Sequence, residues 1–140
     1  MITGEDYRDV FQAEADGNQE ELNRLFAVLE KNHSSKKSID AIFRTMHTLK
    51  GNALGMGFKP IGVLAHALED AFDQIRLGNL VLDVSIFSEL QQGLVVLSAL
   101  IEGLKTGEKV KYLGAKTKLN VLLLKLDEEK RADGKIINRH

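Results

Sequence analysis

Apolar side chains recur every three or four residues along most of this chain, and this spacing constrains the fold more than any other feature. The longest series lies in residues 87–104 and consists of Phe87, Leu90, Leu94, Leu97, Ile101 and Leu104. Such spacing places all six side chains on one face of an α-helix. Asp83 or Ser85 can cap the start of this helix, and Gly107 can end it. Proline interrupts helices, and the 140 residues include only one proline.

Three further segments show the same helical periodicity. One begins near Ser38 and runs out at residues 55–57, and the next has Pro60 in its first turn and ends at residues 77–79. The last carries leucines on one face and ends near Asp133. The side chains predicted to face inward in these segments are Ile39, Ile42, Phe43, Met46, Leu49, Ala53, Ile61, Leu64, Leu68, Phe72, Ile75, Leu119, Leu122, Leu123 and Leu126.

The N-terminal segment, residues 6–31, has a less regular pattern. Leu22, Leu25, Phe26 and Leu29 share a helical face. Asn18 and Glu21 have the spacing of a capping box, yet residues 16–18 (Asp-Gly-Asn) are also a turn signal. The segment is therefore either one helix weakened at Gly17 or a short helix followed by a longer one, and we expect one element that is broken or bent there.

Five helical segments with short connections and no strand pattern predict an all-α fold. The expected architecture is an antiparallel four-helix bundle with an additional C-terminal helix. A chain of this length suffices for one domain, which we place at residues 1–132, with a polar tail at residues 133–140.

Composition excludes several classes of protein. The 19 basic and 20 acidic residues give a formal net charge of -1, so no strong field favours nucleic acid or an acidic membrane. The absence of cysteine removes disulfide scaffolds, thiolate metal sites and cysteine catalysis. No signal peptide is visible, and no segment approaches roughly 18 unbroken apolar residues. We expect a cytoplasmic, monomeric domain that binds neither nucleic acid nor membrane.

The most informative segment is residues 46–58. At about 100° per residue, His47 falls at the edge of the apolar stripe of its helix, and Lys50 follows one turn later. Gly51 and Gly55 lie on the solvent side of His47, together with Arg44, and Leu54 lies at the rim of the stripe. Glycines inside a helix cost about 1 kcal/mol each. They indicate either a close helix crossing or a clear approach for another protein beside the histidine.

The following helix carries a matching polar edge. Gly62, His66, Glu69 and Asp73 gather on one side of its apolar face. If the two helices form an antiparallel hairpin, this edge can face His47.

A histidine paired with a carboxylate has a defined chemistry. The carboxylate accepts the N–H of one ring nitrogen and leaves the lone pair of the other nitrogen pointing outward. Such an imidazole is a nucleophile toward phosphorus, and a nearby lysine stabilises the charge of a transferring phosphoryl group. The chain has no glycine-rich strand-to-helix loop for nucleotide phosphates. These residues predict a phosphocarrier that has no ATP site of its own.

At this point the sequence resembles the histidine phosphotransfer (Hpt) domains, most closely the N-terminal phosphotransfer domain of the chemotaxis histidine kinase CheA. The first motif is a histidine followed after two residues by Lys-Gly, here His47-Thr48-Leu49-Lys50-Gly51. The second is a histidine and a glutamate on the next helix, here His66-Ala67-Leu68-Glu69. The resemblance covers residues 7–105, and the additional helix also suits the CheA type. It implies the Hpt bundle fold.

The resemblance also implies roles for individual residues. His47 would be phosphorylated on Nε2, Glu69 would bind its Nδ1, and Lys50 and His66 would assist around the phosphoryl group. The domain would bind no cofactor. The phosphoryl group would come ultimately from ATP on a histidine kinase catalytic domain and pass to an aspartate of a response-regulator receiver domain, which supplies its own Mg²⁺. We expect Arg44, Gly51, Leu54, Gly55 and Gly62 to contact such partners.

Two other functions remain as alternatives. One is an adaptor that docks receivers without phosphoryl chemistry, although loss of the histidine would be the usual mark of such an adaptor. The other is a metal site in the bundle, formed by His47, His66, Glu69 and Asp73. The sequence does not separate a free-standing phosphotransfer protein from one domain of a larger kinase.

Overall fold

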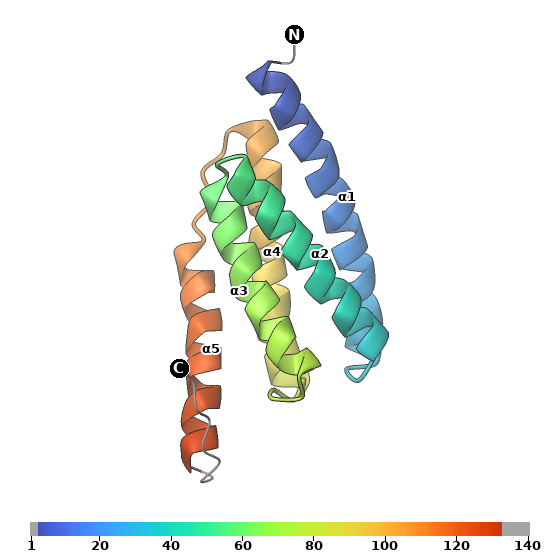
Figure 1. The fold of residues 1–140 in the computed structure, drawn as a ribbon, viewed down its shortest axis with the longest axis vertical. Helices are drawn as coiled ribbons and strands as arrows, with labels where there is room; N and C mark the ends of the chain where they lie inside the picture. Colours follow the sequence, from blue (N-terminus) through green and yellow to red (C-terminus); the bar gives the residue numbers. More distant parts are fainter. Residues whose placement is uncertain (1–2, 133–140) are drawn as a thin grey trace.

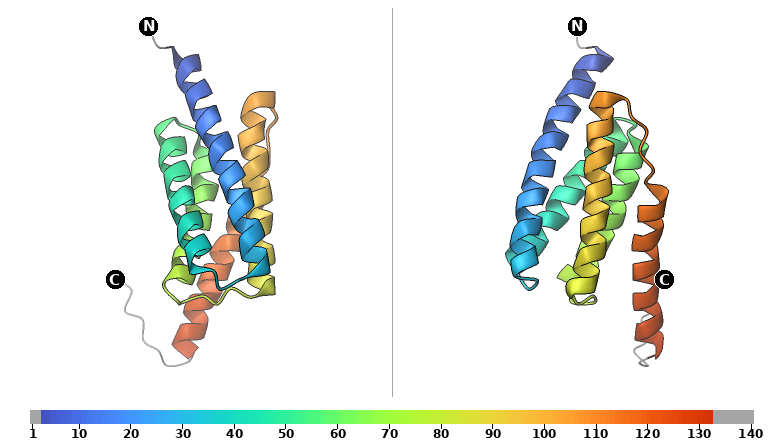
Figure 2. Two further views of the ribbon diagram at one scale, coloured as in Figure 1. Left: turned by 90° about the vertical axis from the view of Figure 1, so that its right-hand side faces the viewer. Right: turned by 180° about the vertical axis from the view of Figure 1, so that it is seen from behind.

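The structure, a computed structural model, describes residues 3–132, and these form five helices with no strand among them. The helices are α1 (Gly4–Lys31), α2 (Lys36–Gly55), α3 (Lys59–Arg76), α4 (Val84–Thr106) and α5 (Leu113–Ala132). Helices α1 to α4 form an antiparallel bundle, and α5 lies along its outside against α3 and α4 (Figures 1 and 2). The predicted all-α bundle with an additional C-terminal helix is confirmed. The expected polar tail, residues 133–140, lies outside the described residues.

Local sequence signals set where the helices begin and end. The side chains of Ser35 and Asp83 accept hydrogen bonds from the backbone of α2 and α4 and so cap them. Gly107 ends α4 with a left-handed backbone at φ 77°, a conformation that glycine adopts without strain. Only three residues separate α2 from α3, so these two helices form a tight hairpin, and this hairpin carries the candidate site.

The N-terminal segment is a single element, as expected, but it is not broken at Gly17, because α1 is one continuous helix of 28 residues. Its capping box is formed by Thr3 and Asp6 rather than by Asn18 and Glu21. Gly17 is exposed, while Ala15 and Leu22 on either side of it are fully buried. Burial of both flanking turns outweighs the cost of about 1 kcal/mol for one helical glycine.

The core fills the space between the four bundle helices and extends to α5. Its largest fully buried side chains include Phe26 of α1 and Phe72 of α3, whose rings meet edge to face with centroids 5.6 Å apart. The predicted inward residues are buried, except that Phe43, Leu104, Leu122 and Leu123 are half-buried. Leu119 of α5 is 1% exposed, so α5 belongs to the same core as the bundle.

Helix α4 is long and apolar enough to cross a membrane, and it is the one such helix among residues 3–132. In this fold its apolar face packs into the bundle, where Leu90, Leu97 and Ile101 are fully buried.

Candidate functional site

His47 and Glu69 meet across the α2–α3 hairpin. Because the two helices run antiparallel from the tight turn at residues 56–58, the middle of α2 lies opposite the middle of α3. Nδ1 of His47 is hydrogen-bonded to Oε2 of Glu69. The imidazole side chain is 64% exposed, whereas the carboxylate side chain is only 7% exposed. A buried acid therefore holds the inner side of a histidine that otherwise faces solvent.

Lys50 completes this group from the next turn of α2. Its Nζ lies 2.7 Å from Oε1 of Glu69, and its side chain is 20% exposed. The two carboxylate oxygens are thus used separately, one by the imidazole and one by the ammonium. A buried carboxylate requires such partners, since an unpaired buried charge is strongly destabilising.

The electrostatics of Glu69 reflect two opposed effects. Burial alone raises the pKa of Glu69, but hydrogen bonds from Lys50 and His47, with their electrostatic attraction, outweigh burial and hold the pKa below its ordinary value. Glu69 is therefore ionised at neutral pH. An ionised carboxylate has no proton to give, so Nδ1 of His47 is the donor.

This arrangement fixes the chemical character of the histidine. With its hydrogen on Nδ1, the neutral ring carries a lone pair on Nε2. Glu69 lies on the Nδ1 side, and most of the ring is exposed. The site therefore combines a nucleophilic nitrogen open to solvent with a fixed negative charge behind it.

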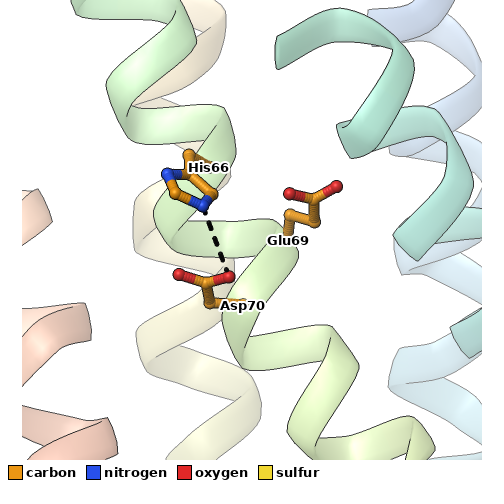
Figure 3. A group of neighbouring side chains, drawn as sticks. All are labelled: His66, Glu69 and Asp70. Carbon is orange, nitrogen blue, oxygen red and sulfur yellow. Dashed lines mark ion pairs between the residues drawn. The ribbon is translucent and has the colours of Figure 1, made fainter. Parts of the chain in front are cut away.

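His66 lies apart from this hydrogen-bonded group. Its Nε2 is 3.6 Å from Oδ1 of Asp70, one turn further along α3. Figure 3 shows His66 and Asp70 paired on one side of α3, while the carboxylate of Glu69 points toward α2. Burial raises the pKa of Asp70, and the attraction of His66 only partly offsets this rise.

The four residues considered for a metal site do not assemble. Asp73 pairs with Arg76 at 2.6 Å, His66 pairs with Asp70, and Glu69 binds His47 and Lys50. In the described part of the chain, the group with metal-ligand geometry is instead His66, Glu69 and Asp70, with ligand atoms within 4.8 Å of one another. A metal ion there would compete with His47 and Lys50 for Glu69.

The glycines near His47 differ in their surroundings. A Cβ at Gly51 or Gly55 would meet nothing within 4 Å, so a helix crossing does not explain either residue. Arg44 and Leu54 are also exposed, and these four residues leave open surface beside His47. Gly62, which we expected to contact a partner, has different surroundings. It is buried under Leu54, whose Cδ2 would lie 2.5 Å from a Cβ at Gly62, so it serves packing rather than contact with a partner.

Two features of the site escaped the sequence analysis. The ion pair between Lys50 and Glu69 depends on the register of the hairpin, which no local pattern specifies. Phe43, expected only in the core, stacks on His47 with ring centroids 6.5 Å apart. The spacing of four residues between Phe43 and His47 was a usable signal, because side chains one turn apart are neighbours on a helix.

Comparison with known proteins identifies the family. The family model of the Hpt domain matches residues 6–105, which include His47, Lys50, His66 and Glu69. The chain belongs to the Hpt domain family. The match spans α1 to α4 except for the ends of the first and last of these helices, and it leaves α5 outside.

Relatives of this Hpt domain are chemotaxis proteins. The chain is 35% identical to the chemotaxis protein CheA of Halobacterium salinarum over 105 residues, which cover 74% of this chain and 16% of that protein. It is 30% identical to CheA of Bacillus subtilis over 119 residues, covering 81% of this chain and 18% of that protein. The chain therefore spans under a fifth of the length of these relatives.

A solved structure shows the same bundle. The CheA phosphotransferase domain from Thermotoga maritima superimposes with a TM-score of 0.64 and 30% sequence identity. The match covers 69% of this chain and 91% of that domain. The Hpt domain described here is thus of the CheA type in both sequence and fold.

Proposed function

We propose that this Hpt domain accepts a phosphoryl group on Nε2 of His47 and passes it to an aspartate of a response-regulator receiver domain. The observation that carries the proposal is the hydrogen bond between the exposed imidazole of His47 and the buried carboxylate of Glu69. It leaves one ring nitrogen free to react and holds the other.

The proposed transfer takes place in two steps. Nε2 attacks phosphorus, a P–N bond forms, and the P–O bond to the donor breaks with its electron pair leaving on the donor oxygen. The ring then carries positive charge, which the adjacent carboxylate of Glu69 stabilises. In the second step the aspartate of the receiver attacks phosphorus and the P–N bond breaks, which returns His47 to its neutral form.

Lys50 supports the site through its charge. Its ammonium lies one turn from His47 and neutralises part of the charge of Glu69. A phosphoryl group on Nε2 brings negative charge close to this lysine, and a cation there favours the transfer. We assign His66 a weaker, assisting role through its pair with Asp70 on the same helix.

The open surface beside His47 is proposed as the docking face. Gly51 and Gly55 present backbone with no side chain above it, while Arg44 and Leu54 add a charge and an apolar contact. A receiver must bring its aspartate within reach of Nε2, and small residues permit this close approach. We propose that the kinase catalytic domain, with ATP, uses the same face, that the receiver brings its own Mg²⁺, and that the domain acts in the cytoplasm as a phosphocarrier.

Radiolabel transfer tests this function. The domain is incubated with a histidine kinase catalytic domain and labelled ATP, and then with a receiver and Mg²⁺. We expect an acid-labile, base-stable label that moves to the receiver and is absent from His47→Gln. His33→Gln is the matched control, since His33 lies in the loop between α1 and α2. Receiver binding without any label on the wild-type domain would favour the docking adaptor instead.

A further inference from the structure

Phe43 is an aromatic neighbour of His47 on α2. It lies one turn before His47 on α2, and the two rings stack at an interplanar angle of 26° with centroids 6.5 Å apart. Phe43 is half-buried and packs against the core. The exposed imidazole therefore has a core-packed aromatic neighbour one turn toward the start of α2.

Arg76 in turn holds Phe43. This arginine is the last residue of α3, and its guanidinium carbon lies 4.6 Å from the centroid of the Phe43 ring. One guanidinium nitrogen is 2.6 Å from Oδ1 of Asp73, one turn earlier on α3. The acid anchors the arginine, and the arginine covers the phenyl ring through a cation–π contact.

The hydrogen bond to Glu69 restrains His47 at a single atom. A single contact at Nδ1 leaves the ring free to rock about that contact, and the side chain is 64% exposed, so few other neighbours limit it. In-line transfer needs the lone pair of Nε2 aimed at phosphorus, and small errors in aim lower the rate. A second contact against the face of the ring would remove this freedom.

We propose that Phe43 and Arg76 are positioning residues, which hold the plane of the His47 imidazole so that Nε2 points along the direction of phosphoryl transfer. Phe43 acts directly on His47, and Arg76 acts through Phe43. Glu69 holds the edge of the His47 ring at Nδ1, and Phe43, supported by Arg76, restrains its face. This inference rests on the proposed function, since it concerns the aim of the reacting nitrogen.

The decisive variant is Arg76→Gln, because Arg76 is partly exposed and its loss leaves the core intact. We expect the maximal rate of phosphoryl transfer to fall about threefold to tenfold, while the receiver concentration at half-maximal rate stays unchanged. Arg76→Lys retains a cation over the ring and is expected to recover most of the rate. Phe43→Leu should reduce the rate at least as much, and Phe43→Tyr should preserve it.

A spectroscopic measurement separates positioning from general stability. Three-bond couplings of the His47 side chain report how many orientations the ring populates. We expect one dominant orientation in the wild type and Arg76→Lys, and averaging over several in Arg76→Gln and Phe43→Leu.

The chain offers a matched control for each variant. Arg24 pairs with Glu21 at 2.5 Å with the same three-residue spacing, but on α1. Phe87 stacks with His33, with ring centroids 5.4 Å apart, and this is a second histidine–phenylalanine stack. Arg24→Gln and Phe87→Leu should leave the orientation of His47 and the maximal transfer rate unchanged.

The outcomes separate this inference from the proposed function. If the wild-type domain takes up no label, the proposed function fails. If the wild type is labelled but Arg76→Gln matches it in rate and in His47 orientation, the positioning role is overturned and the phosphotransfer function stands. If Arg24→Gln lowers the transfer rate as much as Arg76→Gln does, the effect is not positional and the inference is likewise overturned.

Discussion

Glu69 is a buried carboxylate that binds the exposed imidazole of His47, 22 residues earlier in the chain and on the neighbouring helix. Its other oxygen binds Lys50. A charge that would be costly to bury is thus compensated by two residues of α2, and the compensation itself sets the state of the histidine. The stability of the hairpin and the reactivity of His47 depend on the same three side chains.

Replacing Glu69 with glutamine should slow phosphorylation. The amide oxygen of Glu69→Gln can still accept from Nδ1, but the charge that stabilises the phosphorylated ring is lost. A hydrogen bond to a charged group is worth about 1.5–3 kcal/mol, so we expect a rate about 10-fold to 100-fold lower. Initial rates of label uptake measure the effect. Glu102→Gln, which removes a surface acid on α4 beside Lys105, is the control and should leave the rate unchanged.

The contacts of Glu69 should also make the stability of the domain depend on pH in the acid range. Because the pKa of Glu69 lies below its ordinary value of 4.5, the folded state favours the ionised form. Its contribution is therefore fully present well above pH 4.5 and is lost as the pH falls through the lowered pKa. We expect wild type to exceed Glu69→Gln by about 1–3 kcal/mol in free energy of unfolding at pH 7. In urea unfolding measured between pH 7 and pH 3, the difference should shrink only below pH 4.5, the ordinary pKa of glutamate, and its loss above pH 5 would contradict the account.

Two glycine-to-alanine substitutions should differ in their effect on stability. Gly51 has open space around it, so Gly51→Ala should stabilise the domain by about 1 kcal/mol through helix propensity. The added methyl group lies on the proposed docking face and should weaken receiver binding. Gly62→Ala gains the same helix propensity but must displace the side chain of Leu54, so it should stabilise the domain less than Gly51→Ala does. Thermal unfolding and receiver titrations measure both, and equal stability changes would contradict the packing described.

Asp70 should be a mildly destabilising residue at neutral pH. Partial burial and the nearby carboxylates of Glu69 and Asp73 raise the pKa of Asp70, although its side chain is half exposed, so the folded state mildly disfavours its ionised form. Asp70→Asn is therefore expected to raise the free energy of unfolding at pH 7 by less than about 1 kcal/mol. The gain should fade as the pH falls toward the ordinary aspartate pKa of about 3.9, where the unfolded chain is also protonated. Asp9→Asn, on the exposed side of α1, serves as the control, and a loss of stability in Asp70→Asn alone would refute the expectation.

Helix positions were predictable because they depend on local spacing. The apolar stripe of residues 87–104 and the cap at Asp83 both specify α4 without reference to the rest of the chain. The continuity of α1 across Gly17 was not predictable, since it depends on burial of Ala15 and Leu22 by other helices. Local turn signals compete with tertiary packing, and packing prevailed here.

The candidate site was predictable in its residues more than in its contacts. Helical geometry places Glu69 on the edge of α3 that can face His47, and the hairpin brings them together. The remaining contacts depend on the register between α2 and α3. They are the burial of Glu69, its ion pair with Lys50 and the position of Arg76 over Phe43. Gly62 shows the same limit, because its need for close packing arises from Leu54 on the opposite helix.

The nitrogen that carries phosphorus gives the most direct test of the central claim. Phosphorus–nitrogen couplings in the ¹⁵N-labelled, phosphorylated domain distinguish Nε2 from Nδ1 of His47. Because Nδ1 of His47 is hydrogen-bonded to Glu69, we predict the phosphoryl group on Nε2. Nδ1 should keep its hydrogen and still donate it to the carboxylate. A phosphoryl group on Nδ1, or on another residue while His47 stays unmodified, would contradict the account.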